Sequence, residues 1–222
     1  MEIWLDTVDL DTISSANRFG VFYGVTTNPS LISQAKIPLS KIIMKLLETQ
    51  EGPITVQVNS TKAAEIIEEA EEFQSRSDRI IIKIPATQEG LIAIRHLSLK
   101  EVPTMATAVF HPNQFLLAAL AGATYIAPYL SRMSDAGIDP FTILEGMVRM
   151  YKNYDFKTKI LAAALKNSDQ IRRCSEIGIP AITIKDDLFN QFIADHPLTT
   201  QAVENFKLDW EKTKDNNPLY FA

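Results

Sequence analysis

The chain has 222 residues, of which 46% are hydrophobic and 22% charged, with 8 glycines and 11 prolines. This composition is typical of an ordinary globular domain and excludes an intrinsically disordered chain. The net charge of -5, with no stripe of Lys and Arg, argues against a nucleic-acid partner. The single cysteine excludes an internal disulfide, and residues 1–9 lack the features of a signal peptide, so we expect a cytoplasmic protein.

Residues 102–131 contain no Asp, Glu, Lys or Arg, and this run is long enough to raise the question of a membrane-spanning helix. The polar residues His111, Asn113 and Gln114, together with Pro112, interrupt it. The apolar part that follows is too short to cross a bilayer. We therefore expect a segment buried in protein and no membrane partner.

Short apolar runs rich in Ile and Val alternate with helical patterns along the chain. Residues 63–73, for example, place apolar side chains at helical spacing and glutamates on the outer faces. About eight runs are predicted to be strands. They are residues 3–5, 21–25, 54–58, 80–84, 104–110, 125–128, 160–164 and 181–184.

The alternation of strands and helices predicts an α/β fold with a parallel sheet, because strands that are apolar on both faces need helices on both sides. About eight such units in 222 residues predict one (βα)8 TIM barrel domain over residues 1–222. Residues 198–222 are predicted to form an extra C-terminal helix and tail. A doubly wound open sheet is the alternative, but no glycine-rich turn follows the first strand.

Lys83 stands inside a run of isoleucines, residues 80–84, and is the sharpest candidate for chemistry. The active site of such a barrel lies at the C-terminal ends of its strands. Burial disfavours the charged ammonium, and a partly neutral amine attacks carbonyl carbons to form Schiff bases. The alternative is a lysine that protects a sheet edge from aggregation, but a closed barrel has no such edge.

Polar residues also follow the first two predicted strands. Asp6 is a candidate general acid/base, or only a helix cap. Thr26 and Asn28 belong to a segment that forms a turn before the next helix or that binds substrate, since an Asn at a barrel mouth suits sugar hydroxyls.

Gln57, Thr107 and Tyr129 lie at the matching ends of the third, fifth and sixth predicted strands. With the candidates above, they supply one polar side chain from each of the first six strands. Each would cost about 1–3 kcal/mol if buried without a partner, so we expect them to bind one another, water or a substrate. Arg132 and Lys166 follow the sixth and seventh strands and either bind phosphate or lie on the solvated surface.

Several motifs resemble the transaldolase family. They are residues 5–7, 24–30, 83–90, 121–123 and 127–129, with His196-Pro197 and Asp209-Trp210 later in the chain. Gln57 and Tyr129 are similar to the short fructose-6-phosphate aldolase branch, because transaldolases proper typically carry Glu and Phe there. The resemblance implies a (βα)8 barrel in which Lys83 forms the Schiff base and Asp6 is an acid/base. It further implies a catalytic water held by Gln57, Thr107 and Tyr129, sugar hydroxyls near Asn28 and a phosphate at Arg132.

The reaction implied by the resemblance is the reversible cleavage of fructose 6-phosphate into dihydroxyacetone and glyceraldehyde 3-phosphate. A transaldolase, which transfers the dihydroxyacetone unit between ketose and aldose phosphates, is the first alternative. A non-catalytic barrel that binds sugar phosphates is the second. Ala164 departs from the family, which usually has a serine on the phosphate there, so we expect phosphorylated substrates to be held less firmly.

Neither a metal nor another cofactor is expected, because His96, His111 and His196 are far apart and show no ligand spacing. A second chain is expected, since residues 113–121 read as a helix that is apolar nearly all round. The sequence thus predicts a homo-oligomer. The family resemblance suggests rings of five subunits, or two such rings stacked into a decamer.

Overall fold

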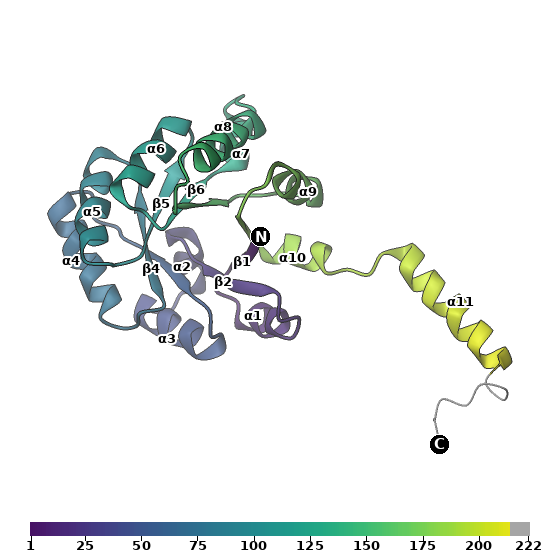
Figure 1. The fold of residues 1–222 in the computed structure, drawn as a ribbon. Coiled ribbons are helices and arrows are strands. Elements are labelled where there is room, and N and C mark those ends of the chain that lie inside the picture. Colours follow the sequence, from purple (N-terminus) through teal and green to yellow (C-terminus); the bar gives the residue numbers. More distant parts are fainter. Residues whose placement is uncertain (214–222) are drawn as a thin grey trace, which may run out of the picture. The chain divides into compact units, whose positions relative to one another are not determined.

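The computed structural model describes residues 1–213, in which eight parallel strands pair in chain order and close into a barrel (Figure 1). The barrel closes because β1 pairs with both β2 and β8. The predicted (βα)8 barrel is therefore confirmed. The strands are β1 (Glu2–Asp6), β2 (Phe22–Thr26), β3 (Ile54–Gln57), β4 (Ile80–Pro85), β5 (Thr104–Val109), β6 (Tyr125–Pro128), β7 (Lys159–Ala162) and β8 (Ala181–Ile184).

Helices follow the strands and cover the outside of the barrel (Figure 1). Most of them bury apolar side chains, as a sheet that is apolar on both faces requires. They are α1 (Leu10–Asn17), α2 (Pro29–Ala35), α3 (Leu39–Thr49), α4 (Ala63–Gln74), α5 (Gln88–Leu99), α6 (Pro112–Ala121), α7 (Leu130–Asp135), α8 (Pro140–Asn153), α9 (Ser168–Ile177) and α10 (Asp186–Phe192).

Three predicted strands end earlier than the sequence suggested, and the first of them, the run 54–58, ends at Gln57 as β3. The run 160–164 ends at Ala162 as β7, and Ala164 has a left-handed backbone with φ of 58°. The run 104–110 ends at Val109 as β5, where Ala108 has φ of 55° and the pairing with β6 shifts between Ala106 and Val109. These positive φ values interrupt the ladder, and apolar composition alone does not reveal them.

The chain divides into two compact units, Met1–Phe189 and Asn190–Ala222. The first contains all the barrel strands. The second contains α11 (Pro197–Thr213), which confirms the predicted C-terminal helix. The predicted tail, residues 214–222, lies outside the described residues. Within residues 1–213, no helix is both long enough and apolar enough to cross a membrane.

A buried cluster fills the inside of the barrel. Because successive side chains of a strand point to opposite faces, these residues identify the inner face of each strand that they belong to. The cluster consists of Trp4, Ile81, Met105, Tyr125, Ala127, Leu161, Ala163 and Ala181.

A polar network lies at the N-terminal end of the barrel. Lys159, the first residue of β7, forms an ion pair with Glu2 of β1. The Tyr125 hydroxyl donates to Glu2 Oε2 at 3.0 Å, and Trp4 Nε1 donates to the same oxygen at 3.2 Å. Glu2 thus gathers side chains from three strands, β1, β6 and β7, at the end opposite the expected active site.

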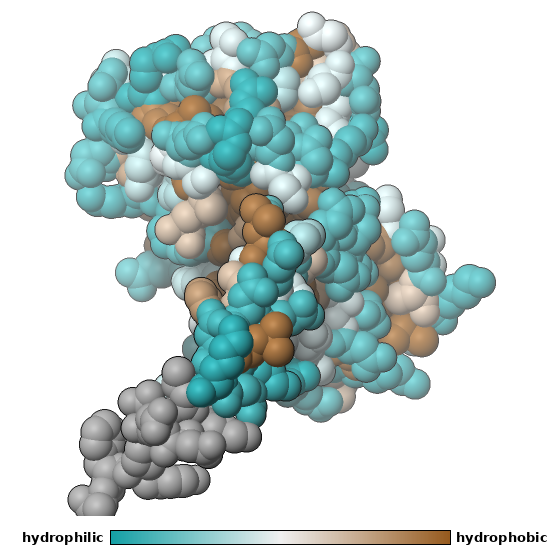
Figure 2. Space-filling view, turned by 90° about the vertical axis from the view of Figure 1, so that its right-hand side faces the viewer, coloured by the Kyte–Doolittle hydropathy of each residue, from teal (hydrophilic) through white to brown (hydrophobic). Residues whose placement is uncertain are grey.

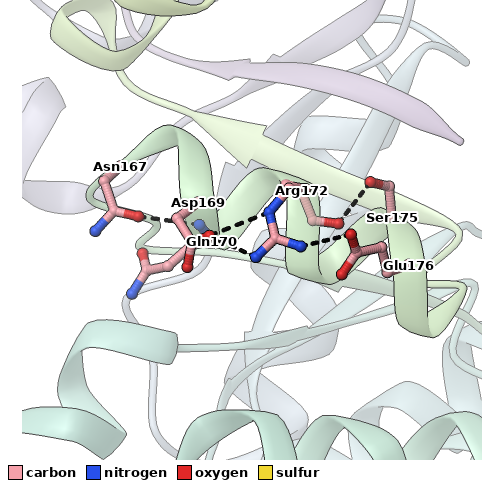
Figure 3. Close-up of polar contacts among 6 residues, drawn as sticks. All are labelled: Asn167, Asp169, Gln170, Arg172, Ser175 and Glu176. Atoms are coloured by element: carbon pink, nitrogen blue, oxygen red, sulfur yellow. Dashed lines mark hydrogen bonds and ion pairs between the residues drawn. The ribbon is translucent and has the colours of Figure 1, made fainter.

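The helix α9 follows the loop that carries Lys166, and its own side chains hold its ends in place (Figure 3). Asn167 caps the helix by accepting from the Gln170 backbone N–H at 2.9 Å. Arg172 pairs with Asp169 and Glu176 on the exposed face. These contacts stabilise the helix, and the positive charge of Arg172 is paired with the two carboxylates.

Candidate active site

The inner face of the barrel ends in polar side chains at the C-terminal ends of the strands. Each lies two positions after a residue of the buried interior cluster and therefore points the same way. The residues found in this way are Asp6, Lys83, Thr107, Tyr129 and Thr183. This is the end at which (βα)8 enzymes have their active sites.

Lys83 is 4% exposed, in a strand whose neighbours Ile82 and Ile84 are fully buried. Its Nζ donates a hydrogen bond to the backbone carbonyl of Thr27 at 3.0 Å. Gln57 of β3 stands opposite Lys83 in the strand register. The amine is therefore shielded from bulk water and points past β3 to the loop after β2.

Asp6 accepts hydrogen bonds from two residues around that loop. Thr26 Oγ1 donates to Asp6 Oδ1 at 3.0 Å, and Asn28 Nδ2 donates to the same oxygen at 3.2 Å. Asn28 also caps α2, since its Oδ1 accepts from the Leu31 backbone N–H at 3.1 Å. Asn28 is therefore both the helix cap and a partner of the predicted acid/base, while Thr27 between them holds Lys83.

Thr107 and Tyr129 form a second hydrogen-bonded pair. The Thr107 Oγ1 and Tyr129 hydroxyl oxygens lie 2.7 Å apart. The Tyr129 ring packs edge-on against Phe110 with ring centroids 6.0 Å apart. Two contacts thus fix the position of the phenol at the barrel mouth.

Gln57 is half-buried at the end of β3 and lines a cavity of about 210 Å³ together with Thr27 and Asn28. This cavity places its amide beside the loop that carries the partners of Asp6 and Lys83. Lys83 lies on the same side of the mouth, because it neighbours Gln57 in the strand register and binds the Thr27 carbonyl.

The two predicted phosphate-binding cations differ in their surroundings. Arg132 of α7 is exposed and lines a cavity of about 540 Å³ with Phe110 and Tyr129. Lys166 pairs with Asp135, with Nζ and Oδ1 3.5 Å apart, and both side chains are exposed. The structure therefore brings Arg132 next to Tyr129, whereas the charge of Lys166 is partly neutralised by a carboxylate.

Two site residues were missed by sequence reasoning. Thr183 of β8 is buried at 4% exposure, and its Oγ1 lies 2.7 Å from Thr26 Oγ1. The sequence signal for Thr183 was a single hydroxyl group in an apolar run, two positions after the inward-facing Ala181. Asp186 begins α10, and burial raises the pKa of its carboxyl. A hydrogen bond with Thr7 opposes this rise, and the nearby charges of Asp9 and Asp6 add to it. In sequence it reads as an ordinary helix-start aspartate.

Other reactive groups lie outside this arrangement. Burial raises the pKa of the Cys174 thiol to about 12, so it stays protonated and unreactive near neutral pH. In the described part of the chain, no group of three or more His, Cys, Asp or Glu side chains is arranged to hold a metal ion.

A solved structure supports the fold alone. A mandelate oxidase mutant with an FMN adduct superimposes with a TM-score of 0.56 at 11% identity. The match covers 84% of this chain and 64% of the oxidase chain.

Sequence comparisons are more specific. A family model described as Transaldolase/Fructose-6-phosphate aldolase matches residues 3–217. A protein named "Probable transaldolase" from Carboxydothermus hydrogenoformans is 38% identical and covers 96% of this chain and 100% of its own length. Another of the same name, from Thermoplasma acidophilum, is 37% identical and covers 99% of each chain. The chain therefore belongs to the transaldolase/fructose-6-phosphate aldolase family.

Proposed function

We propose that the chain is a class I aldolase that reversibly cleaves fructose 6-phosphate into dihydroxyacetone and glyceraldehyde 3-phosphate. Membership of the family implies a metal-independent Schiff-base enzyme. The observation that carries the proposal is the buried Lys83, whose Nζ donates to the Thr27 carbonyl beside the residues that bind Asp6. A non-catalytic binding protein has no use for a desolvated amine at this position.

The first step is formation of the Schiff base. The neutral amine of Lys83 attacks the ketone carbon. The carbonyl oxygen takes up one proton from the amine and one from an acid group, leaves as water, and a protonated imine remains. The hydrogen bond to the Thr27 carbonyl holds the amine in one orientation for this attack.

The second step is cleavage of the carbon-carbon bond. A base removes the proton from the hydroxyl on the carbon beyond that bond, and the electron pair of the bond moves toward the imine. The aldehyde leaves and an enamine of dihydroxyacetone remains. Asp6, held by Thr26 and Asn28, and Tyr129, held by Thr107, are the groups that move these protons.

The fate of the enamine separates an aldolase from a transaldolase. Protonation and attack by water release dihydroxyacetone, whereas a transaldolase passes the enamine to an aldose phosphate. Gln57 supports the aldolase, because a side-chain amide cannot exchange a proton as the carboxyl of a transaldolase does. In this chain the Tyr129 phenol is the proton-transfer group instead. The same two residues favour the fructose-6-phosphate aldolase branch of the family.

The phosphate end of the substrate is assigned to Arg132, with Lys166 as a weaker partner because it already pairs with Asp135. Thr26, the last residue of β2, and Asn28, in the loop that follows, are assigned to substrate binding. Sugar phosphates are the substrate class of the family, while Ala164 offers no hydroxyl group to the phosphate. We accordingly propose that unphosphorylated aldehydes compete well with phosphorylated ones.

The Schiff base can be trapped directly. Wild-type protein is incubated with fructose 6-phosphate and borohydride, and the reduced adduct is located by peptide mass spectrometry. The adduct is expected on Lys83 and is expected to be lost in Lys83→Met. It is expected to persist in Lys100→Met, which removes an exposed lysine that pairs with Glu71. If no adduct forms under these conditions, the remaining hypothesis is a non-catalytic barrel that binds sugar phosphates.

The release assay then distinguishes the two reactions. Free dihydroxyacetone is measured with fructose 6-phosphate alone and after addition of a second aldose phosphate. An aldolase releases it in both cases. Formation of glyceraldehyde 3-phosphate only in the presence of the acceptor, without free dihydroxyacetone, would instead identify a transaldolase.

We also propose that the enzyme acts in the cytoplasm as a homo-oligomer, a pentamer or a decamer. Leu117 and Leu120 of α6 are 52% and 63% exposed, although Phe115 and Ala118 of the same helix are buried. On the face of the molecule drawn in Figure 2, scattered apolar areas likewise interrupt an otherwise hydrophilic surface. A second copy that covers the exposed face of α6 would remove these leucines from water.

A further inference from the structure

Three side chains from three neighbouring strands form a hydrogen-bonded chain inside the barrel. Thr183 Oγ1 of β8 lies 2.7 Å from Thr26 Oγ1 of β2. Thr26 Oγ1 lies 3.0 Å from Asp6 Oδ1 of β1, the strand between the other two. Both hydroxyl groups are buried, with Thr26 at 1% and Thr183 at 4% exposure.

The direction of this chain follows from the number of protons. An ionised carboxylate only accepts hydrogen bonds, so Thr26 must use its single hydroxyl proton to donate to Asp6. Thr26 can then only accept from Thr183, and the order of donation is Thr183 to Thr26 to Asp6. The other acceptor near Thr26 is the Leu5 carbonyl, at 3.5 Å, which is too long to compete well.

We propose that Thr183 is a positioning residue for Asp6 and acts through Thr26, in the carbon-carbon bond cleavage proposed above. This inference rests on the proposed aldolase function. Without the Thr183 hydroxyl, the Thr26 proton is free to turn toward another acceptor, and the carboxylate loses the fixed donor that holds its orientation. The chain also strengthens the bond to Asp6, because a hydroxyl that accepts a hydrogen bond becomes a better donor.

The test removes the hydroxyl and keeps the shape. In Thr183→Val, we expect kcat for fructose 6-phosphate cleavage to fall about tenfold, while KM changes less than about twofold. The proton transfer needs an oriented Asp6, whereas Thr183 lies behind Thr26, which explains why kcat is affected more than KM. The protein is expected to fold, because valine has nearly the volume of threonine.

Thr104→Val is the matched control. Thr104 of β5 is fully buried like Thr183, but its Oγ1 has no hydrogen-bond partner within residues 1–213. It lies at the N-terminal end of its strand, away from the site. We expect this variant to keep its kcat within about twofold of wild type, since no hydrogen bond is lost.

A second pair of variants tests whether the loss of kcat comes from the missing hydroxyl group or from altered packing. Thr183→Ser and Thr183→Ala both remove the methyl group, and they differ only in the hydroxyl group. We expect Ser to keep at least about half of the wild-type kcat and Ala to behave like Val. Equal kcat values in Ser and Ala, or a wild-type kcat in Thr183→Val, would overturn the inference.

The same experiments separate this inference from the proposed function. Wild-type protein that forms no borohydride adduct on Lys83 overturns both. If wild-type protein cleaves the ketose and Thr183→Val has the same kcat, only the proposed role of Thr183 is overturned. The expected result is a reducible Lys83 adduct in both proteins and slower cleavage of fructose 6-phosphate in the variant alone.

Discussion

The hydroxyl groups of Thr107 and Tyr129 lie 2.7 Å apart, so a residue of β5 holds the phenol that follows β6. Thr107 is fully buried and its neighbour Ala108 takes a left-handed backbone, which ends the regular pairing of β5. The irregularity lies directly beside the phenol. Strain of this kind tends to persist where a site requires it.

Tyr129→Phe is expected to lower kcat about 100-fold, because it removes one proton-transfer group. The ring contact with Phe110 is kept, so the Lys83 adduct should still form in the borohydride experiment. Tyr154→Phe is the control, since Tyr154 is exposed and lies at the end of α8. Wild-type turnover in Tyr129→Phe would remove the phenol from the mechanism.

The barrel and much of its site were predictable because they depend on local patterns. Isoleucines on both sides of Lys83 predicted a buried strand, and the structure has that amine 4% exposed. The alternation of side chains along a strand then places Asp6 and Thr107 on the inner face. Residue type and spacing along one strand carry this information.

The remaining features depend on contacts between distant parts of the chain. Thr183 and Thr26 are 157 residues apart in sequence and meet only because the barrel closes. The pairing of Lys166 with Asp135 joins the loop after β7 to α7, and no periodic pattern predicts it. Both contacts are consequences of tertiary packing, and a single sequence does not indicate which of these residues meet.

Asp6→Asn tests the second proton-transfer group. The substitution keeps the size of the side chain, but an amide can neither accept nor release the proton, so kcat should fall by about 100-fold or more. Asp155→Asn is the control, because Asp155 is exposed and its ion-pair partner among residues 1–213 is the nearby Lys157. If Asp6→Asn cleaves fructose 6-phosphate at the wild-type rate, another group must move the proton.

Ala164→Ser tests the phosphate end of the site. A hydroxyl group at this position adds a donor near Lys166, and serine tolerates the left-handed backbone of 58° about as well as alanine. We expect kcat/KM for glyceraldehyde 3-phosphate to rise about tenfold relative to unphosphorylated glyceraldehyde, measured in the synthetic direction. An unchanged ratio would show that position 164 does not approach the phosphate.

The exposed leucines of α6 predict the assembly. Wild-type protein should elute from a size-exclusion column well ahead of a 24.9 kDa monomer. Leu120→Lys should shift elution toward the monomer, because a lysine in a buried interface is costly. Leu99→Lys, at the exposed end of α5, serves as a control of similar exposure. Monomeric wild-type protein would contradict the proposed oligomer.

The network around Glu2 predicts how stability depends on pH. Burial, and secondarily the Glu2 carboxylate, raises the pKa of Tyr125 above its usual 10.0. The hydrogen bond to Glu2 raises the pKa of Lys159 above 10.5. In both cases the unfolded chain loses its proton first as the pH rises. Stability is therefore retained below about pH 10 and falls above it.

Urea unfolding between pH 8 and pH 11 measures this effect. The Tyr125 contribution alone should lower the unfolding free energy by up to about 1.4 kcal/mol per pH unit above pH 10. Tyr125→Phe should be less stable at pH 8, because it loses the hydrogen bond to Glu2, yet it should lose less stability on going to pH 11. Tyr154→Phe, which removes an exposed phenol, should keep the wild-type slope. Identical alkaline slopes in wild type and Tyr125→Phe would show that the buried phenol ionises as easily in the folded protein as in the unfolded chain.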